Sequence, residues 1–204
     1  MYVFGHTGIA AGLAYLGQYF SKSRSLWNAR PDSPVIYAEE SGRQRPRPWY
    51  RGGATGGAGL VDFRIIVVGV MLPDIIDKPL GPWTFNTGRM IGHTLFLNLL
   101  LLTIGVIILS GWGRVGFLTF ALASTLHLIQ DAMWSDPEVL LWPLYGWRFP
   151  ETGVAAVADR LHELTHNPGI YVPELVGGVM LAVFFLRVWT EREWQACLRW
   201  GTLR

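Results

Sequence analysis

Residues 93–112, which read HTLFLNLLLLTIGVIILSGW, decide the fold of this chain of 204 residues. No charged side chain follows the initial histidine, and an apolar run of about 20 residues is long enough to cross a bilayer as one helix. Four further apolar segments accompany it along the chain, at residues 3–20, 60–77, 115–131 and 170–189. The sequence therefore predicts an all-α fold, a polytopic membrane bundle of about five transmembrane helices.

The composition excludes most other classes of protein. Hydrophobic residues make up 50% of the chain and charged residues only 16%, whereas a soluble domain carries about 25% charge. The formal net charge of +2 gives no reason to expect a nucleic-acid partner. A single cysteine, Cys197, excludes an intramolecular disulfide and a cysteine-based zinc site. We predict one membrane domain over residues 1–204.

Two of the predicted helices have alternative interpretations. Residues 3–20 lack the preceding basic residues and the following A-x-A-like site of a signal peptide, so we interpret them as a retained helix. Residues 60–77 contain Asp62 and Arg64, and a buried or re-entrant helix is the alternative there.

Lysine and arginine are distributed unevenly between the two sides of such a bundle. With five crossings, 13 of the 17 basic residues fall on one side, and only Lys78, Arg89, Arg148 and Arg160 fall on the other. Because the basic side of a membrane protein faces the cytoplasm, we predict a multi-pass cell-membrane protein with an extracytoplasmic N-terminus. The outer membrane surface is then flanked by four tryptophans: Trp83, Trp134, Trp142 and Trp147.

Two segments differ in composition from the apolar runs. Residues 21–59 are rich in Pro, Gly and Arg and predict a flexible, basic cytoplasmic loop. A solvated linker is the simplest interpretation, with contact to anionic lipid or to a cytoplasmic protein partner as alternatives. Residues 190–204 form a basic cytoplasmic tail.

Histidines and aspartates gather at the predicted outer ends of four helices, in a position where ionisable groups usually have a task. They are His6, Asp74, Asp77, His93, His127 and Asp131. Several carboxylates near imidazoles favour a bound divalent cation, with zinc preferred and manganese or iron as alternatives. The i, i+4 spacing of His127 and Asp131 places both on one helix face. Taken singly, each residue has a simpler interpretation as an interfacial, capping or hydrogen-bonded group.

Prolines flank the acidic pair in residues 73–79. Because proline removes a backbone donor, Pro73 and Pro79 predict a helix break that bends the helix end over a cavity. Asp77 lies one turn from Asp74, and we expect it to orient the attacking water or to accept its proton. Asp131 is the second residue for which we expect a catalytic role.

Residues 162–166 read HELTH and match the H-E-x-x-H pattern of zinc proteases. The residues around them, from Gly153 onward, predict a short amphipathic helix in the outer loop. Against a protease, Asn167-Pro168-Gly169 ends that helix at once, and neither the usual third ligand nor a strand pattern is present. A supplementary role in the His/Asp cluster is the alternative, for the residues His162, Glu163, His166 and Glu174.

Five stretches resemble the YdjM-like family of membrane-bound metal-dependent hydrolases, also described as LexA-binding inner-membrane proteins. They are GHTGIA (5–10), GVMLPDIIDKPLG (69–81), GHTLF (92–96), HLIQDAMW (127–134) and PEVLLWPLYGW (137–147). The order of the His and Asp residues is also similar to that of the metal ligands in zinc-dependent phospholipase C. These resemblances imply one or two metal ions and a phosphoester substrate, with the ligands His6, Asp74, His93, His127 and Asp131.

The sequence thus favours a membrane-bound metal-dependent hydrolase acting on a phosphoester or other ester of a lipid or lipid-linked substrate. Two alternatives belong to other classes. The first is a transporter or ion-conducting protein with an Asp/His relay, which predicts polar residues along whole helices. The second is a membrane adaptor that binds a cytoplasmic regulator through residues 21–59 and the basic tail.

Overall fold

The computed structural model describes residues 3–28, 62–84, 87–151 and 157–192, together with residues 194, 195 and 197. These residues form seven α-helices and no β-strand, which confirms the predicted all-α fold. The helices are α1 (Val3–Asn28), α2 (Phe63–Leu80), α3 (Leu95–Trp112), α4 (Gly116–Gln130), α5 (Pro137–Leu140), α6 (Val157–His166) and α7 (Pro168–Thr190). Short 3-10 turns lie at η1 (Gly81–Trp83), η2 (Ile91–His93) and η3 (Met133–Ser135).

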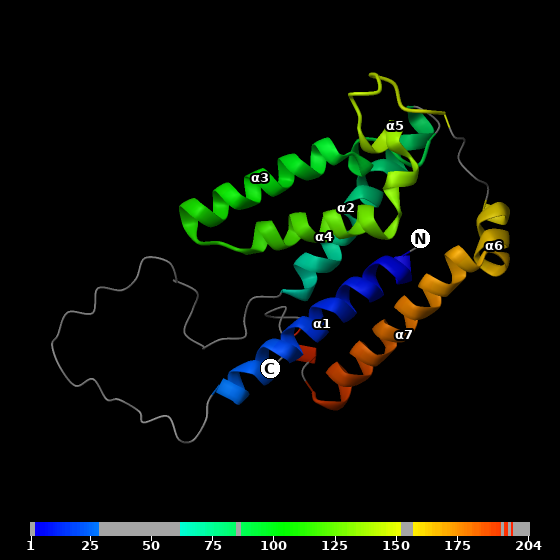
Figure 1. Ribbon diagram of the computed structural model, residues 1–204. Helices are drawn as coiled ribbons and strands as arrows, with labels where there is room; N and C mark the ends of the chain where they lie inside the picture. Colours follow the sequence, from blue (N-terminus) through cyan, green and yellow to red (C-terminus); the bar gives the residue numbers. More distant parts are fainter. Residues whose placement is uncertain are drawn as a thin grey trace.

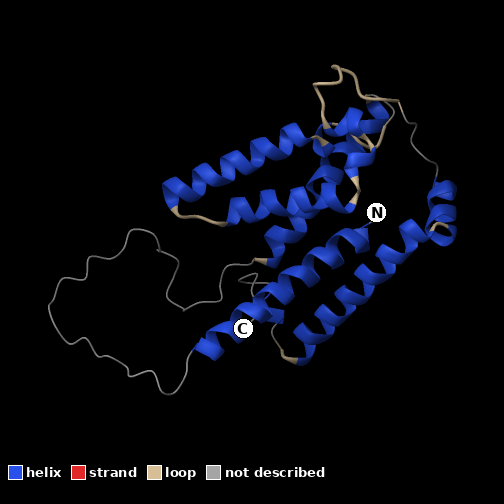
Figure 2. Cartoon of the chain, in the orientation of Figure 1, coloured by secondary structure: helices blue, strands red, loops and turns tan. Residues whose placement is uncertain are grey.

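The long helices pack in pairs around α2. Helices α1 and α7 run side by side, α3 and α4 form a hairpin, and α2 contacts both α1 and α4 (Figure 1). In the described part of the chain, loops and turns connect one helix to the next (Figure 2). The start of α1, the end of α2, the start of α3 and the end of α4 lie toward the same end of the bundle. The predicted metal ligands are carried by these four helix ends.

Two helices have the length and hydropathy to cross a membrane: α3, with a mean hydropathy of 2.2, and α7, with 1.9. Only 11% of the apolar window of each is buried inside the protein, and α4 is apolar but shorter. Large apolar side chains such as Leu99, Val106 and Ile107 are exposed, while His93 and Asn98 are almost fully buried. Polar groups inside and apolar groups outside are the arrangement that a hydrocarbon environment requires.

Short polar caps fix where the helices begin. The Asp62 carboxylate accepts a hydrogen bond from the Arg64 backbone N–H (2.9 Å) at the start of α2, and Thr94 Oγ1 accepts one from Leu97 N–H (3.2 Å) at the start of α3. The Arg64 guanidinium also donates a hydrogen bond to this carboxylate, with Nη2 2.7 Å from Asp62 Oδ2. The predicted boundaries hold to within a few residues except in α1, which continues to Asn28 and so includes the beginning of the predicted loop. Residues 29–61 lie outside the described residues.

The predicted helix break at Pro73 and Pro79 is wrong, because α2 continues through both residues to Leu80. A proline removes one backbone donor and crowds the carbonyl one turn earlier, and packing against neighbouring helices can compensate for this loss. In the turn that precedes Pro73, the Val70 carbonyl lies 2.7 Å from His127 Nδ1 on α4. The backbone of α2 therefore supplies an acceptor for a site residue.

Glycines allow α1 and α7 to approach closely. A Cβ atom on Gly8 would overlap the Gly177 carbonyl, and a Cβ atom on Gly177 would overlap the Phe4 carbonyl. Small residues at a helix interface let two backbones come into contact in a membrane, where apolar burial supplies little driving force. The contact fixes the position, relative to α7, of the α1 segment that contains His6.

We expect Gly177→Val to separate α1 from α7, since the new side chain has no space beside Phe4. The free energy of unfolding should fall by about 1–3 kcal/mol. This fall is measured as a lower unfolding temperature of the purified protein in detergent. Gly178→Val is the matched control, because a Cβ atom there meets nothing within 4 Å. Equal unfolding temperatures for the two variants would contradict the close helix contact.

Candidate metal centre

The structure brings together all five residues predicted as metal ligands. They come from α1, α2, η2 and the end of α4: His6, Asp74, His93, His127 and Asp131. The three imidazoles are at most 1% exposed, and the two carboxylate side chains are 6% exposed. The cluster is therefore a buried polar site formed by segments far apart in the sequence.

Each imidazole is oriented by a hydrogen bond at its Nδ1 atom. The pairs are His6 with Gln130 Oε1 (2.8 Å), His93 with Asp77 Oδ2 (2.7 Å) and His127 with the Val70 carbonyl (2.7 Å). All three partners are acceptors, so the Nδ1 atoms carry the protons and donate them. The Nε2 atoms of the neutral rings are consequently lone-pair donors, the form in which histidine binds a metal.

The Nε2 atoms and the carboxylate oxygens converge on one small volume. His93 Nε2 and His127 Nε2 are 3.2 Å apart, and Asp74 Oδ1 lies 3.8 Å from the first and 3.9 Å from the second. The Asp131 carboxylate also lies close to these two rings, with Oδ2 3.7 Å from His93 Nε2 and 3.8 Å from His127 Nε2. Its Oδ1 atom lies 3.2 Å from His6 Nε2.

These distances fit a metal ion. Two imidazole nitrogens bound tetrahedrally to one zinc ion lie roughly 3.3 Å apart, given Zn–N distances of about 2.0–2.1 Å. Two sets of three donors have ligand atoms within 4.8 Å of one another: His6, His127 and Asp131, and Asp74, His93 and His127. Because His127 belongs to both sets, the donors suit one ion or a pair of neighbouring ions.

The electrostatics of the cluster also favour a cation. The lone pairs of His93 Nε2 and His127 Nε2 face each other at 3.2 Å and repel unless a proton or a metal lies between them. His6 Nε2 is fully buried and, despite its short distance to Asp131, makes no hydrogen bond within the described part of the chain. An unsatisfied buried nitrogen is costly, and a metal–ligand bond would satisfy it. The residues therefore fit a divalent metal ion.

Asp77 lies behind His93 and is fully buried. Its carboxylate accepts hydrogen bonds from the backbone N–H groups of Met90 (2.6 Å), Gly92 (2.9 Å) and His93 (3.2 Å), in addition to His93 Nδ1. These four bonds hold the turn η2 and the His93 ring against α2. Metal-binding histidines commonly donate their second ring N–H to a carboxylate in this way.

Two basic side chains border the cluster. Lys78 Nζ lies 2.6 Å from Asp74 Oδ2, and Arg89 places one guanidinium nitrogen 3.3 Å from Asp131 Oδ2 and another 2.5 Å from Asp136 Oδ2. Their side chains are 41% and 38% exposed, in contrast to the buried ligands. Lys78 and Arg89 therefore connect the buried cluster to the surface of the protein.

The H-E-x-x-H residues lie on α6 (Val157–His166), and the predicted start of this helix at Gly153 lies outside the described residues. His162, Glu163 and His166 are exposed, and the two imidazole rings stack on each other with centroids 4.2 Å apart. The metal-competent donor sets found among the described residues include neither these side chains nor Glu174. A supplementary role for the four residues stays a prediction.

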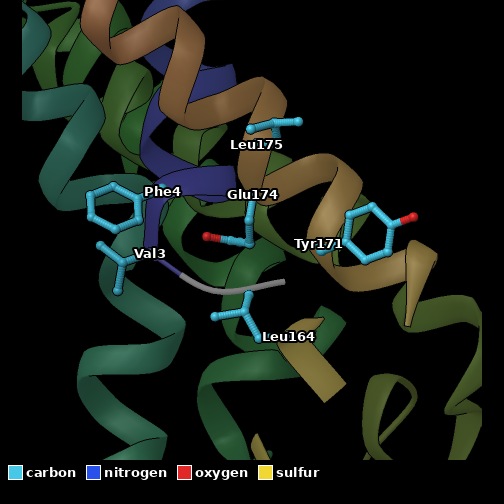
Figure 3. Close-up of a pocket in the computed structure, with 6 residues that line it drawn as sticks. All are labelled: Val3, Phe4, Leu164, Tyr171, Glu174 and Leu175. Carbon is cyan, nitrogen blue, oxygen red and sulfur yellow. The ribbon is translucent and has the colours of Figure 1, made fainter. Parts of the chain in front are cut away.

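An apolar cavity of about 480 Å³ lies between the starts of α1 and α7 and the end of α6 (Figure 3). It is lined by Val3, Phe4, Leu164, Tyr171, Glu174 and Leu175. Glu174 is the acidic side chain in this lining and is 8% exposed. Because Phe4 precedes His6 by two residues on α1, the cavity and the predicted metal ligands occupy the same end of the bundle.

Sequence reasoning missed two of the groups that orient the ligands. Gln130 directly precedes Asp131, and its position three residues after His127 was a usable signal, since it reaches the same end of α4. The Val70 carbonyl carries no side-chain signal, and only the three-dimensional packing of α2 against α4 reveals it.

The comparisons with known proteins agree with this architecture. No curated protein and no solved structure matches the chain. A family model described as YdjM inner membrane protein matches residues 1–194. The chain, with its apolar helices and its buried His/Asp cluster, belongs to the YdjM inner membrane protein family.

Proposed function

We propose that this protein is an integral-membrane metal-dependent hydrolase that cleaves a phosphoester or other ester of a lipid or lipid-linked substrate. One observation carries the proposal. Three buried imidazoles present unprotonated Nε2 atoms beside two carboxylates, and six pairs of these ligand atoms are 3.2–3.9 Å apart. Buried ionisable groups in a membrane protein are costly, and such groups usually mark a functional site.

A divalent ion such as zinc, with manganese or iron as alternatives, supplies Lewis-acid activation of a water molecule and of the scissile ester. The chain supplies the positioning. Gln130, Asp77 and the Val70 carbonyl fix the three rings, and burial excludes bulk water from their Nε2 atoms. Asp131 lies within 3.8 Å of all three Nε2 atoms and is our candidate for the residue that handles the proton of the attacking water.

The apolar cavity supports a substrate with a hydrocarbon chain. Its lining residues lie beside the membrane-length helix α7, and the exposed side chains of Tyr171 and Leu175 border both the cavity and the outer surface of that helix (Figure 3). A lipid chain could enter such a cavity from the bilayer without crossing water. Each methylene buried there contributes about 0.8 kcal/mol of binding.

We also propose that the cluster faces the extracytoplasmic side. Five crossings with an outer N-terminus leave 13 of the 17 Lys and Arg residues on the cytoplasmic side, which agrees with the positive-inside rule. The ligands at the start of α1 and at the ends of α2 and α4 then share the outer membrane face. A substrate would reach them from the outer leaflet.

The test is metal content and hydrolysis measured on one detergent-purified preparation. We expect one or two zinc ions per chain by mass spectrometry, and release of phosphate from lysophosphatidic acid that stops with EDTA and returns with zinc. Glycerol 3-phosphate, which lacks the acyl chain, should be a poorer substrate. Leu175→Trp should raise KM for lysophosphatidic acid about tenfold or more, because it fills the cavity. Val179→Trp, one turn further along α7, is the matched control.

The outcome that contradicts the proposal is metal-free protein, or metal-loaded protein that hydrolyses neither phosphoesters nor carboxyl esters. Proton or cation flux in liposomes without hydrolysis would favour the transporter alternative. Loss of function on deletion of residues 29–59, with His127→Ala unaffected, would favour the adaptor.

A further inference from the structure

Both proposed ligand carboxylates also contact a basic side chain. Asp74 directs Oδ1 toward the imidazoles and Oδ2 toward Lys78, and Asp131 directs Oδ2 toward both the imidazoles and Arg89. The side chains of Lys78 and Arg89 therefore lie between the buried cluster and the protein surface. Each is about two-fifths exposed, so a solute can contact them without unfolding the site.

The net charge of the metal-loaded cluster favours the binding of an anion. Asp74, Asp77 and Asp131 carry three negative charges, and Lys78 with Arg89 carries two positive charges. One divalent ion would make the sum positive by one unit, and a second would raise it further. Asp136, which holds Arg89 at 2.5 Å, offsets one unit but is 45% exposed and therefore screened by solvent.

Lys78 and Arg89 also keep donor capacity for a ligand. An ammonium group has three N–H donors and a guanidinium group has five, more than their contacts to Asp74, Asp131 and Asp136 require. The guanidinium fork matches the spacing of two phosphate oxygens, and lysine acts as a point charge beside it. Asp131 and Asp136 hold the fork at the border of the cluster.

We propose that Lys78 and Arg89 form an anion-recognition pair that binds the phosphoryl oxygens of the substrate, so that the site selects a phosphoester over a neutral carboxyl ester. This inference rests on the proposed hydrolase function and adds the substrate class. The residues bind and orient the phosphoryl group beside the metal ligands, and they take no part in the proton transfer.

The experiment measures binding of inorganic phosphate to the zinc-loaded full chain in detergent by titration calorimetry at low salt. Arg89→Gln and Lys78→Gln should each weaken binding about 10- to 100-fold, the range of a charged hydrogen bond. Arg89→Lys should restore part of the affinity, because it keeps the charge but loses the fork. Arg148→Gln removes an exposed arginine on the same predicted side and should leave binding unchanged.

The zinc content of each variant shows whether Lys78 and Arg89 bind phosphate or only hold the metal-ligand carboxylates in place. Unchanged zinc with weakened phosphate binding supports the pair, whereas zinc loss in proportion to phosphate loss in Arg89→Gln and Lys78→Gln overturns it. Failure of phosphate to bind the wild-type protein also overturns the anion-recognition pair. In that case, hydrolysis of a neutral carboxyl ester by the same preparation would leave the proposed hydrolase function intact. Phosphate binding without any turnover supports the pair and contradicts the hydrolase. Displacement of phosphate by lysophosphatidic acid but not by glycerol 3-phosphate assigns the anion to a lipid headgroup.

Discussion

Asp131→Asn is expected to abolish both metal binding and hydrolysis while the protein still inserts into the membrane. The Asp131 carboxylate is the central donor of the cluster, 3.2 Å from His6 Nε2 and 3.7–3.8 Å from the Nε2 atoms of His93 and His127. An amide is similar in shape but uncharged, so it is a poor ligand for zinc. The loss in affinity should exceed about 100-fold, since even residues behind the ligands cost 10- to 100-fold.

Metal analysis and thermal unfolding measure this effect independently of activity. A metal present at 100 times its Kd stabilises the folded state by about 2.7 kcal/mol, and Asp131→Asn should lose this increment on addition of zinc. Asp62→Asn is the matched control, because it makes the same change at the far end of α2, where asparagine is an equally good N-cap. Wild-type zinc content and turnover in Asp131→Asn would refute the site.

Much of the fold could be predicted from sequence because hydropathy reports directly on a bilayer environment. Residues 93–112 contain the whole of α3, and residues 170–189 cover all but the ends of α7. The course of α2 could not be predicted in the same way. Proline has a strong local effect, and only the packing of α2 against α1 and α4 shows that the helix continues through Pro73 and Pro79.

The residues of the His/Asp cluster could be predicted from sequence more readily than the groups that orient them. The i, i+4 pair His127 and Asp131 is readable in one dimension, and the other ligands follow once the helix ends are placed on one side. Ring orientation depends on which acceptor lies behind each imidazole, and those acceptors come from distant segments: His6 and Gln130 are 124 residues apart. Spacing along the chain carries no information on such contacts.

The hydrogen bonds of Asp77 favour a different role from the one expected from sequence. Proximity to Asp74 suggested a residue that contacts the attacking water. In the fold, Asp77 is fully buried, and its carboxylate accepts three backbone N–H groups and the His93 ring N–H. We infer that Asp77 is a positioning residue, which holds η2 in place and keeps His93 Nε2 unprotonated and directed into the His/Asp cluster.

Asp77→Asn separates the two roles. An amide offers one acceptor oxygen and places an NH₂ group against backbone donors, so we expect the free energy of unfolding to fall by about 2–5 kcal/mol. Because the His93 ring loses its anchor, zinc affinity should fall about 10- to 100-fold, as measured by competition with a chelator of known affinity. Excess zinc should restore both occupancy and turnover in Asp77→Asn, whereas Asp131→Asn should stay inactive under the same conditions.

A residue that accepts the proton of the attacking water would behave differently. Its loss lowers kcat even when the metal site is full, because proton transfer contributes typically 10²- to 10⁴-fold to the rate. Full zinc occupancy at wild-type affinity with a kcat reduced to that extent would therefore assign Asp77 to the chemistry. Asp136→Asn is the matched control: this carboxylate is 45% exposed and contacts Arg89, so its loss should leave zinc affinity unchanged. The rescue by zinc discriminates the two roles because only a positioning defect is corrected by mass action.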